Sequence, residues 1–276
     1  MGISLRHHVL TLVGIFLMLL VGLLVGFGLA KQPGLEPRLE KQIGDLAQRV
    51  DYMTEHLERD ARTQEDFARA SLPRLVGRRL EGRRIALVVT ARPEDSSVAQ
   101  TASEALEAAG ASVPYRVICR RDFIERALAD SGAQSEEAGA SEAAATELAQ
   151  CLLRGDPDAL TTLKKRGLIR VKGKLVNGAP DAVVLIGGAG EGLEAEADFI
   201  DRPLVAGLQA GGVRSIVGCE DLAPVTYMDV YRELDISTVD NVGLARGQVS
   251  LVLALSGRPG NYGDGPSAEE EFPTLE

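Results

Sequence analysis

Residues 181–188, DAVVLIGG, are the most apolar of five short β-rich runs, and they decide the fold class. Val and Ile favour strands, and a short apolar run that ends at a glycine pair is typical of a strand buried on both faces. Similar short β-rich runs occur at residues 85–90, 113–119, 215–220 and 236–240. We therefore predict a sheet of about five strands.

Helical patterns separate these runs, and one begins at Asp156-Pro157, a good cap and first-turn pair. The expected helices cover residues 97–110, 127–150, 157–165, 201–211, 228–234 and 248–255. Alternating strands and helices imply a three-layer, Rossmann- or flavodoxin-like α/β domain over residues 83–257, with a mainly parallel sheet. Residues 258–276 hold five acids and one base, so we expect an acidic, solvated tail.

The N-terminal part has a different composition. After a short tail, residues 1–8, residues 9–30 carry no charge, and as a helix they would span about 33 Å, enough to cross a bilayer. A cleaved signal peptide is the alternative, but its apolar region is usually only about 7–15 residues long. We therefore predict a retained transmembrane anchor in contact with membrane lipid. The Lys and Arg count on the two sides does not decide its direction.

Beyond Pro33-Gly34, residues 35–76 follow a heptad pattern typical of a coiled-coil stalk. Its apolar seam consists of Leu39, Ile43, Leu46, Val50, Met53 and Leu57. In the anchor, Gly22, Gly26 and Ala30 form a small-residue stripe that lets two helices approach closely. Together these patterns predict a homo-oligomer, and the alternative is one amphipathic helix packed on its own domain.

Two segments are candidates for ligand or partner binding. Gly187, Gly188 and Gly190 follow a buried strand, although neither a G-x-G-x-x-G nor a Walker motif is present. Asp240 and Asn241 follow the fifth strand, whose carboxyl end would face the same crevice. The structural alternatives are a simple turn at the glycines and, at Asp240 and Asn241, a cap for the helix carrying residues 248–255, which we favour.

The composition argues against several classes of protein. The only histidines are His7, His8 and His56, all outside the α/β domain, so we expect no enzyme. The three cysteines, Cys119, Cys151 and Cys219, have neither metal-site spacing nor clustered methionines nearby, so we expect no metal site and no cofactor. A Cys119–Cys219 disulfide would require neighbouring strand ends. The net charge of −10 argues against a nucleic-acid partner.

Two terminal segments carry a family resemblance. ISLRHHVLTLVGIFLMLLVGLLVG, which begins at Ile3, and STVDNVGLARGQVSLVLALSGRPGNYG, residues 237–263, resemble the bacterial MctB family of copper transport proteins. One departure is Gly243, where the family often has an acidic residue.

The resemblance implies a bacterial envelope protein with its C-terminal domain outside the cytoplasm. It implies a role in copper efflux or homeostasis with copper ions as cargo, although no ligand cluster is seen. Related SteB-type proteins act with a cytoplasmic or envelope partner in cell-envelope assembly and division. A membrane-anchored scaffold without transport activity of its own is therefore the alternative function.

Overall fold

The computed structural model describes most of the chain and divides it into two compact units, residues 1–63 and residues 64–276. Backbone is described for residues 5–30, 35–90, 97–131, 137–188, 195–221 and 223–274. Side chains are described for the same residues, with four exceptions at helix ends: residues 5–11, 27–30, 35–41 and 137–138.

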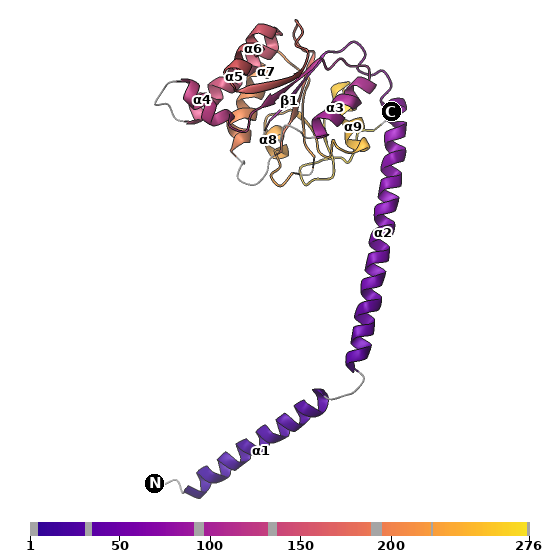
Figure 1. Ribbon diagram of the computed structural model, residues 1–276, viewed down its shortest axis with the longest axis vertical. Helices are drawn as coiled ribbons and strands as arrows, with labels where there is room; N and C mark the ends of the chain where they lie inside the picture. The colour runs from indigo at the N-terminus through magenta and orange to yellow at the C-terminus, as the bar shows by residue number, and fades with distance from the viewer. Residues whose placement is uncertain are drawn as a thin grey trace. The chain divides into compact units, whose positions relative to one another are not determined.

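The first unit is helical (Figure 1). Helix α1 covers Leu5–Ala30, and helix α2 covers Leu35–Val76 and continues into the second unit. The large apolar side chains of residues 12–26 are all more than half exposed, and so are the described seam residues of α2, namely Ile43, Leu46, Val50, Met53 and Leu57. Among the residues that the structure describes, no helix combines the length and the apolar character needed to cross a membrane.

The second unit contains a seven-stranded sheet with the order β3-β2-β1-β4-β5-β6-β7. The strands are β1 Ile85–Val89, β2 Tyr115–Cys119, β3 Ile169–Gly173, β4 Ala182–Ile186, β5 Ile216–Cys219, β6 Ser237–Val239 and β7 Asn261–Tyr262. All neighbouring pairs are parallel except β2 and β3. The predicted mainly parallel α/β fold is confirmed, whereas the prediction of about five strands missed β3 and β7.

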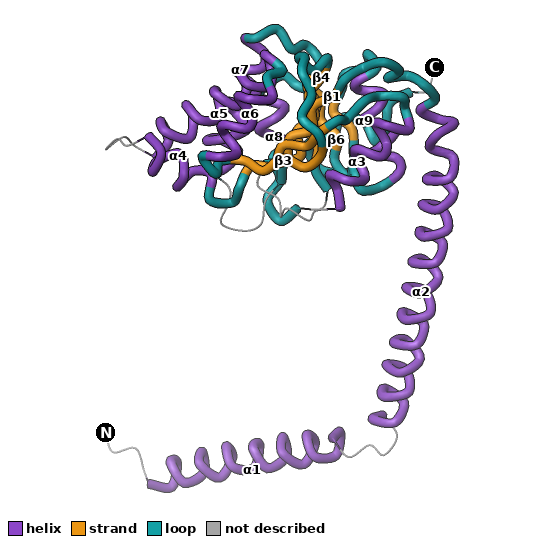
Figure 2. The backbone as a smooth tube through the Cα atoms, turned by 45° about the horizontal axis from the view of Figure 1, so that its top comes forward, coloured by secondary structure: helices purple, strands orange, loops and turns teal. Residues whose placement is uncertain are grey.

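Helices cover both faces of this sheet (Figures 1 and 2). They are α3 Ser97–Ala108, α4 Phe123–Ser131, α5 Glu137–Arg154, α6 Pro157–Lys165, the short π-helix η1 Ala197–Asp201, α7 Arg202–Ala210, α8 Met228–Glu233 and α9 Ala245–Leu255. Alternate residues of a strand point to opposite faces, so β1 supplies Ala86 and Val88 to one core and Leu87 to the other. The first core packs under α4 to α8, and the second under α3, α9 and the end of α2.

Local signals explain several of these helices. Asp156 caps α6 as predicted, because its Oδ1 accepts from the amides of Asp158 at 2.9 Å and Ala159 at 3.4 Å. Residues 248–255 are helical, as predicted, within α9. The segment predicted to be a solvated tail departs from that prediction, because β7 adds to β6 and Tyr262 is buried in the second core.

Candidate functional site

Asp240 and Asn241 line a cavity of about 310 Å³ at the carboxyl ends of β5 and β6. Its described lining is strongly acidic: Glu220, Asp221, Ala223, Thr226, Met228, Asp240, Asn241, Asp264, Gly265, Pro266 and Ser267. The carboxyl edge of a parallel sheet is where open α/β domains bind ligands, so the cavity lies at the edge that the sequence indicates.

Both carboxylate oxygens of Asp240 accept hydrogen bonds from within the protein. Its carboxylate accepts from the amide of Asp264 at 2.9 Å and from the amide of Gly265 at 2.7 Å. Gly263 packs so closely that an added Cβ would lie 1.8 Å from Oδ1 of Asp240. Asn241 has a left-handed backbone, φ 51°, and donates to Asp264 at 2.9 Å. These residues therefore join the loop after β6 to the loop after β7.

Glu220 is similarly engaged. Its carboxylate accepts from the hydroxyl of Thr226 at 2.6 Å and from the amide of Tyr227 at 3.0 Å, and it is 7% exposed. The backbone carbonyl of Glu220 accepts from the amide of Val242 at 3.0 Å. This wall of the cavity is thus a braced loop junction, and Glu220 is oriented by protein donors.

The prediction that Asp240 and Asn241 cap the last helix is wrong. Leu244 occupies the N-cap position of α9 and makes no side-chain cap bond. The amide of Ala245 instead donates to Oε1 of Glu65 at 2.9 Å, a residue of α2 far away in the sequence. The Asp240 carboxylate binds amides of the loop after β7, and the first turn of α9 is capped by Glu65.

The two described glycines after β4, Gly187 and Gly188, have structural roles. A Cβ on Gly187 would lie 2.1 Å from the hydroxyl of Tyr231 and 2.9 Å from the ring of Tyr227, so only glycine fits there. Gly188 has φ 79°, a left-handed conformation that glycine adopts readily. Neither glycine lines the cavity that contains Asp240. Gly190 lies outside the described residues.

A buried polar cluster near the end of β1 was not anticipated from the sequence. Asp201, fully buried, accepts from the Thr90 hydroxyl at 3.0 Å and from the Tyr231 hydroxyl through a very short bond, both at Oδ2. Its Oδ1 is buried without a hydrogen-bond partner among the described residues. Thr90 follows β1, next to the point between β1 and β4 where the strand order reverses. The sequence Asp-Arg-Pro at residues 201–203 predicts only the start of a helix, so it does not indicate that the Asp201 carboxyl is buried.

Burial raises the pKa values of two carboxyls in this region, those of Asp201 and Glu196. Desolvation raises the pKa of Asp201 to about 7, against the opposing effect of its bonds from Tyr231 and Thr90. Burial, followed by the charges of Asp201 and Glu125, raises the pKa of Glu196 to about 7. Burial therefore favours the protonated form of both carboxyls up to about neutral pH.

The cysteines are free thiols, all buried. Burial is the main cause that raises the pKa of Cys119, Cys151 and Cys219, and nearby carboxylates add to the rise. A raised pKa disfavours the thiolate, which is the form that binds metals. Within the described ranges, no group of three or more His, Cys, Asp or Glu side chains is arranged to hold a metal ion.

Comparison with known proteins gives a consistent result over almost the whole chain. A family model described as "Copper transport outer membrane protein, MctB" matches residues 2–273. Proteins named copper transporter MctB from Mycobacterium bovis and Mycobacterium tuberculosis are 26% identical to this chain over 311 aligned positions. These alignments cover 96% of this chain and 98% of each relative.

Proposed function

We propose that this chain, which belongs to the MctB family, acts in copper transport and copper homeostasis at a bacterial membrane. The observation that carries the proposal is the family match over residues 2–273, which includes the N-terminal apolar helix, the stalk and the α/β domain. The relatives are matched over nearly their whole length, so the proposal concerns the complete arrangement of parts.

The membrane attachment is assigned to residues 9–30. This stretch carries no charge and falls within helix α1, and its described large apolar side chains are all more than half exposed. Removal of such side chains from water favours insertion into lipid. We assign the α/β domain to the side of the membrane away from the cytoplasm, in line with the envelope role implied by the family.

Self-association through the stalk is the second part of the proposal. The described seam residues of α2 are 53–67% exposed, from Val50 at the low end to Leu57 at the high end. The ion pairs Arg59–Glu55 and Arg62–Glu58 fall on heptad positions that face away from this seam. A second copy would bury the seam while leaving these charges in water. Gly22 and Gly26 have open space around them, which suits close helix contact in lipid.

The chemistry of the thiols bears on how copper is handled. Copper(I) favours thiolate and thioether ligands, whereas Cys119 and Cys219 are buried and their pKa values are raised. One helix per chain also cannot enclose a pore. We therefore assign the transport step to an oligomer or to a complex with a cytoplasmic or envelope protein, in which this chain is one component.

A membrane-anchored scaffold for envelope assembly and division is the second candidate. The exposed apolar seam of α2 favours it, because such a surface suits protein association and needs no ligand chemistry. No catalytic activity is assigned to the chain, in agreement with a transport family.

The two candidates are separated by a deletion strain scored for copper tolerance and cell shape in the same cultures. Copper transport predicts growth arrest at copper concentrations that the parent tolerates, with rescue by the intact gene. Full copper tolerance combined with abnormal division would reject the transport proposal and favour the scaffold. A reporter that is active only outside the cytoplasm, fused after Glu276, should be active, and activity of a cytoplasmic reporter alone would reject the orientation.

A further inference from the structure

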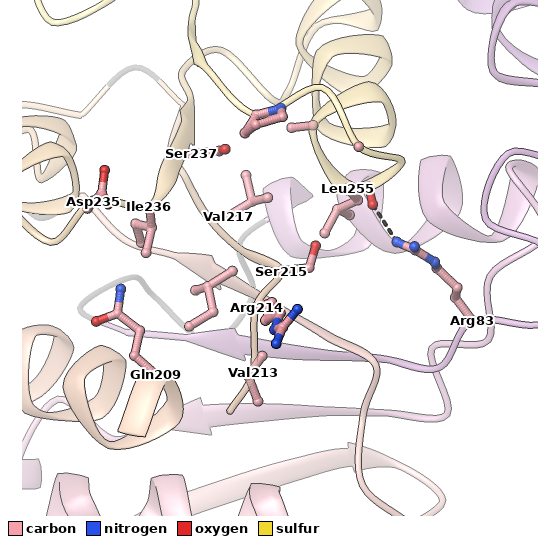
Figure 3. Close-up of a pocket in the computed structure, with 14 residues that line it drawn as sticks. Arg83, Gln209, Val213, Arg214, Ser215, Val217, Asp235, Ile236, Ser237 and Leu255 are labelled. Atoms are coloured by element: carbon pink, nitrogen blue, oxygen red, sulfur yellow. Dashed lines mark hydrogen bonds between the residues drawn. The ribbon is translucent and has the colours of Figure 1, made fainter. Parts of the chain in front are cut away.

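A second cavity, of about 300 Å³, lies at the amino-terminal ends of β5 and β6, opposite the acidic cavity (Figure 3). It is formed where the turn before β1, the loop after α7 and the end of α9 meet. Such a volume is at the small end of the range for ligand pockets, which is about 300–1,000 Å³. Nothing in the copper-related proposal uses this cavity.

Two arginines give the cavity its cationic side. Arg83 is half-buried, and its guanidinium donates to the carbonyl of Leu255 at 2.5 Å, which fixes the side chain at the end of α9 (Figure 3). That bond uses one of the five N–H groups of a guanidinium. Arg214, an exposed residue, lies beside Ser215 in the same lining and makes no hydrogen bond or ion pair with any described residue. The cavity therefore presents guanidinium N–H groups that donate to no described protein acceptor and are open to a ligand or to water.

The rest of the lining limits the ligand. Buried apolar side chains form one part of the wall, namely Ile216, Val217, Ile236 and Leu255. Asp235 lies across the cavity from Arg83 and has no ion-pair partner among the described residues (Figure 3). Two guanidinium groups and one carboxylate give the lining a formal charge of +1. A singly charged anion with a short apolar body matches that charge and that wall.

We propose that this cavity binds a small organic monocarboxylate, with its carboxylate on Arg214 and Arg83 and its apolar part against the start of β5. The planar guanidinium matches a carboxylate in geometry, and a charged hydrogen bond of this kind is stronger than a neutral one. Inorganic phosphate could meet the same arginines, but it has no apolar part to cover the wall formed by Ile216, Val217, Ile236 and Leu255. The small volume excludes a large ligand.

The test is a titration of the full chain in neutral detergent micelles with sodium butyrate, followed by saturation-transfer difference NMR. We expect saturable binding, and R214Q should weaken it about tenfold or more, because a hydrogen bond to a charged group is lost. D235N should strengthen binding, since it removes the repelling carboxylate. R79Q is the matched control: Arg79 is exposed, lies outside the lining and should bind butyrate like the parent.

Three results would overturn the proposal. They are the absence of saturable butyrate binding to the parent, parent-like binding by R214Q, and an equal loss in R79Q, which would indicate only a general positive field. Inorganic phosphate is titrated in competition with butyrate, and acetate is the comparator. Displacement of butyrate by phosphate at lower concentrations than by acetate would reject the monocarboxylate assignment.

Discussion

Asp201 should make the stability of the α/β domain depend on pH in a defined direction. In the unfolded chain this carboxyl has its ordinary pKa of 3.8, whereas in the fold burial raises the pKa to about 7. Between these pH values the folded state binds more protons than the unfolded state, so the free energy of unfolding falls as pH rises. The difference of about three pKa units corresponds to about 4 kcal/mol, a large fraction of the stability of an ordinary domain.

The substitution Asp201→Asn removes this titration while keeping the size of the side chain. Its amide oxygen can still accept from Tyr231 and Thr90, but its NH₂ group would occupy the buried position of Oδ1, where no described partner exists. Absolute stability is therefore a poor readout, because an unpaired buried donor costs about 1–3 kcal/mol. The slope of stability against pH is the informative quantity.

The assay is urea unfolding of the full chain in micelles at several values from pH 4 to pH 8, followed by tyrosine signals, since the chain has no Trp. Relative to Asp201→Asn, the parent should lose about 3 kcal/mol more between pH 4 and pH 7, and the difference should level off by pH 8, where the folded carboxyl is largely ionised. Asp198→Asn is the control, because Asp198 is exposed and paired with Arg202. Equal slopes for the parent and Asp201→Asn would refute the reasoning.

Three further perturbations follow from the fold. Replacing Leu46 and Val50 together with Glu should place charges in the exposed seam of α2 and reduce the mass of the solubilised particle in light scattering; an unchanged mass would contradict the coiled coil. Glu65→Ala should lower stability by about 0.5–2 kcal/mol in urea unfolding, the usual cost of a lost helix cap, and a change near zero would show that water replaces the carboxylate. Gly187→Ala should lower stability by about 1–3 kcal/mol, because the added Cβ overlaps the Tyr231 hydroxyl; unchanged stability would mean that this ring can shift freely.

Much of the fold could be predicted because apolar periodicity reports burial. The run at residues 181–188 contains β4, which is buried at every position, and four similar runs contain β1, β2, β5 and β6. The antiparallel edge strand β3 was not predicted, because its exposed Arg170 and Lys172 interrupt the apolar pattern. The two residues of β7 are too few to give a periodic signal.

The candidate site was predictable in position and much less so in its contacts. Asp240 lies at the carboxyl edge of the sheet, as strand order alone indicates, but its partners come from the loop after β7. Glu65 caps α9 across a long sequence separation, which no local capping rule can detect. Asp201 has the sequence context of a helix cap, and only the fold reveals it as a buried carboxyl between β1 and α8.

The most direct test of the central claim is the copper content of cells, measured by mass spectrometry in the parent, the deletion strain and the deletion strain carrying the intact gene, after growth in the same sublethal copper concentration. A role in copper transport and homeostasis predicts more copper per cell in the deletion strain than in the parent, and a return to the parent value with the intact gene. Equal copper content in all three strains would contradict the account.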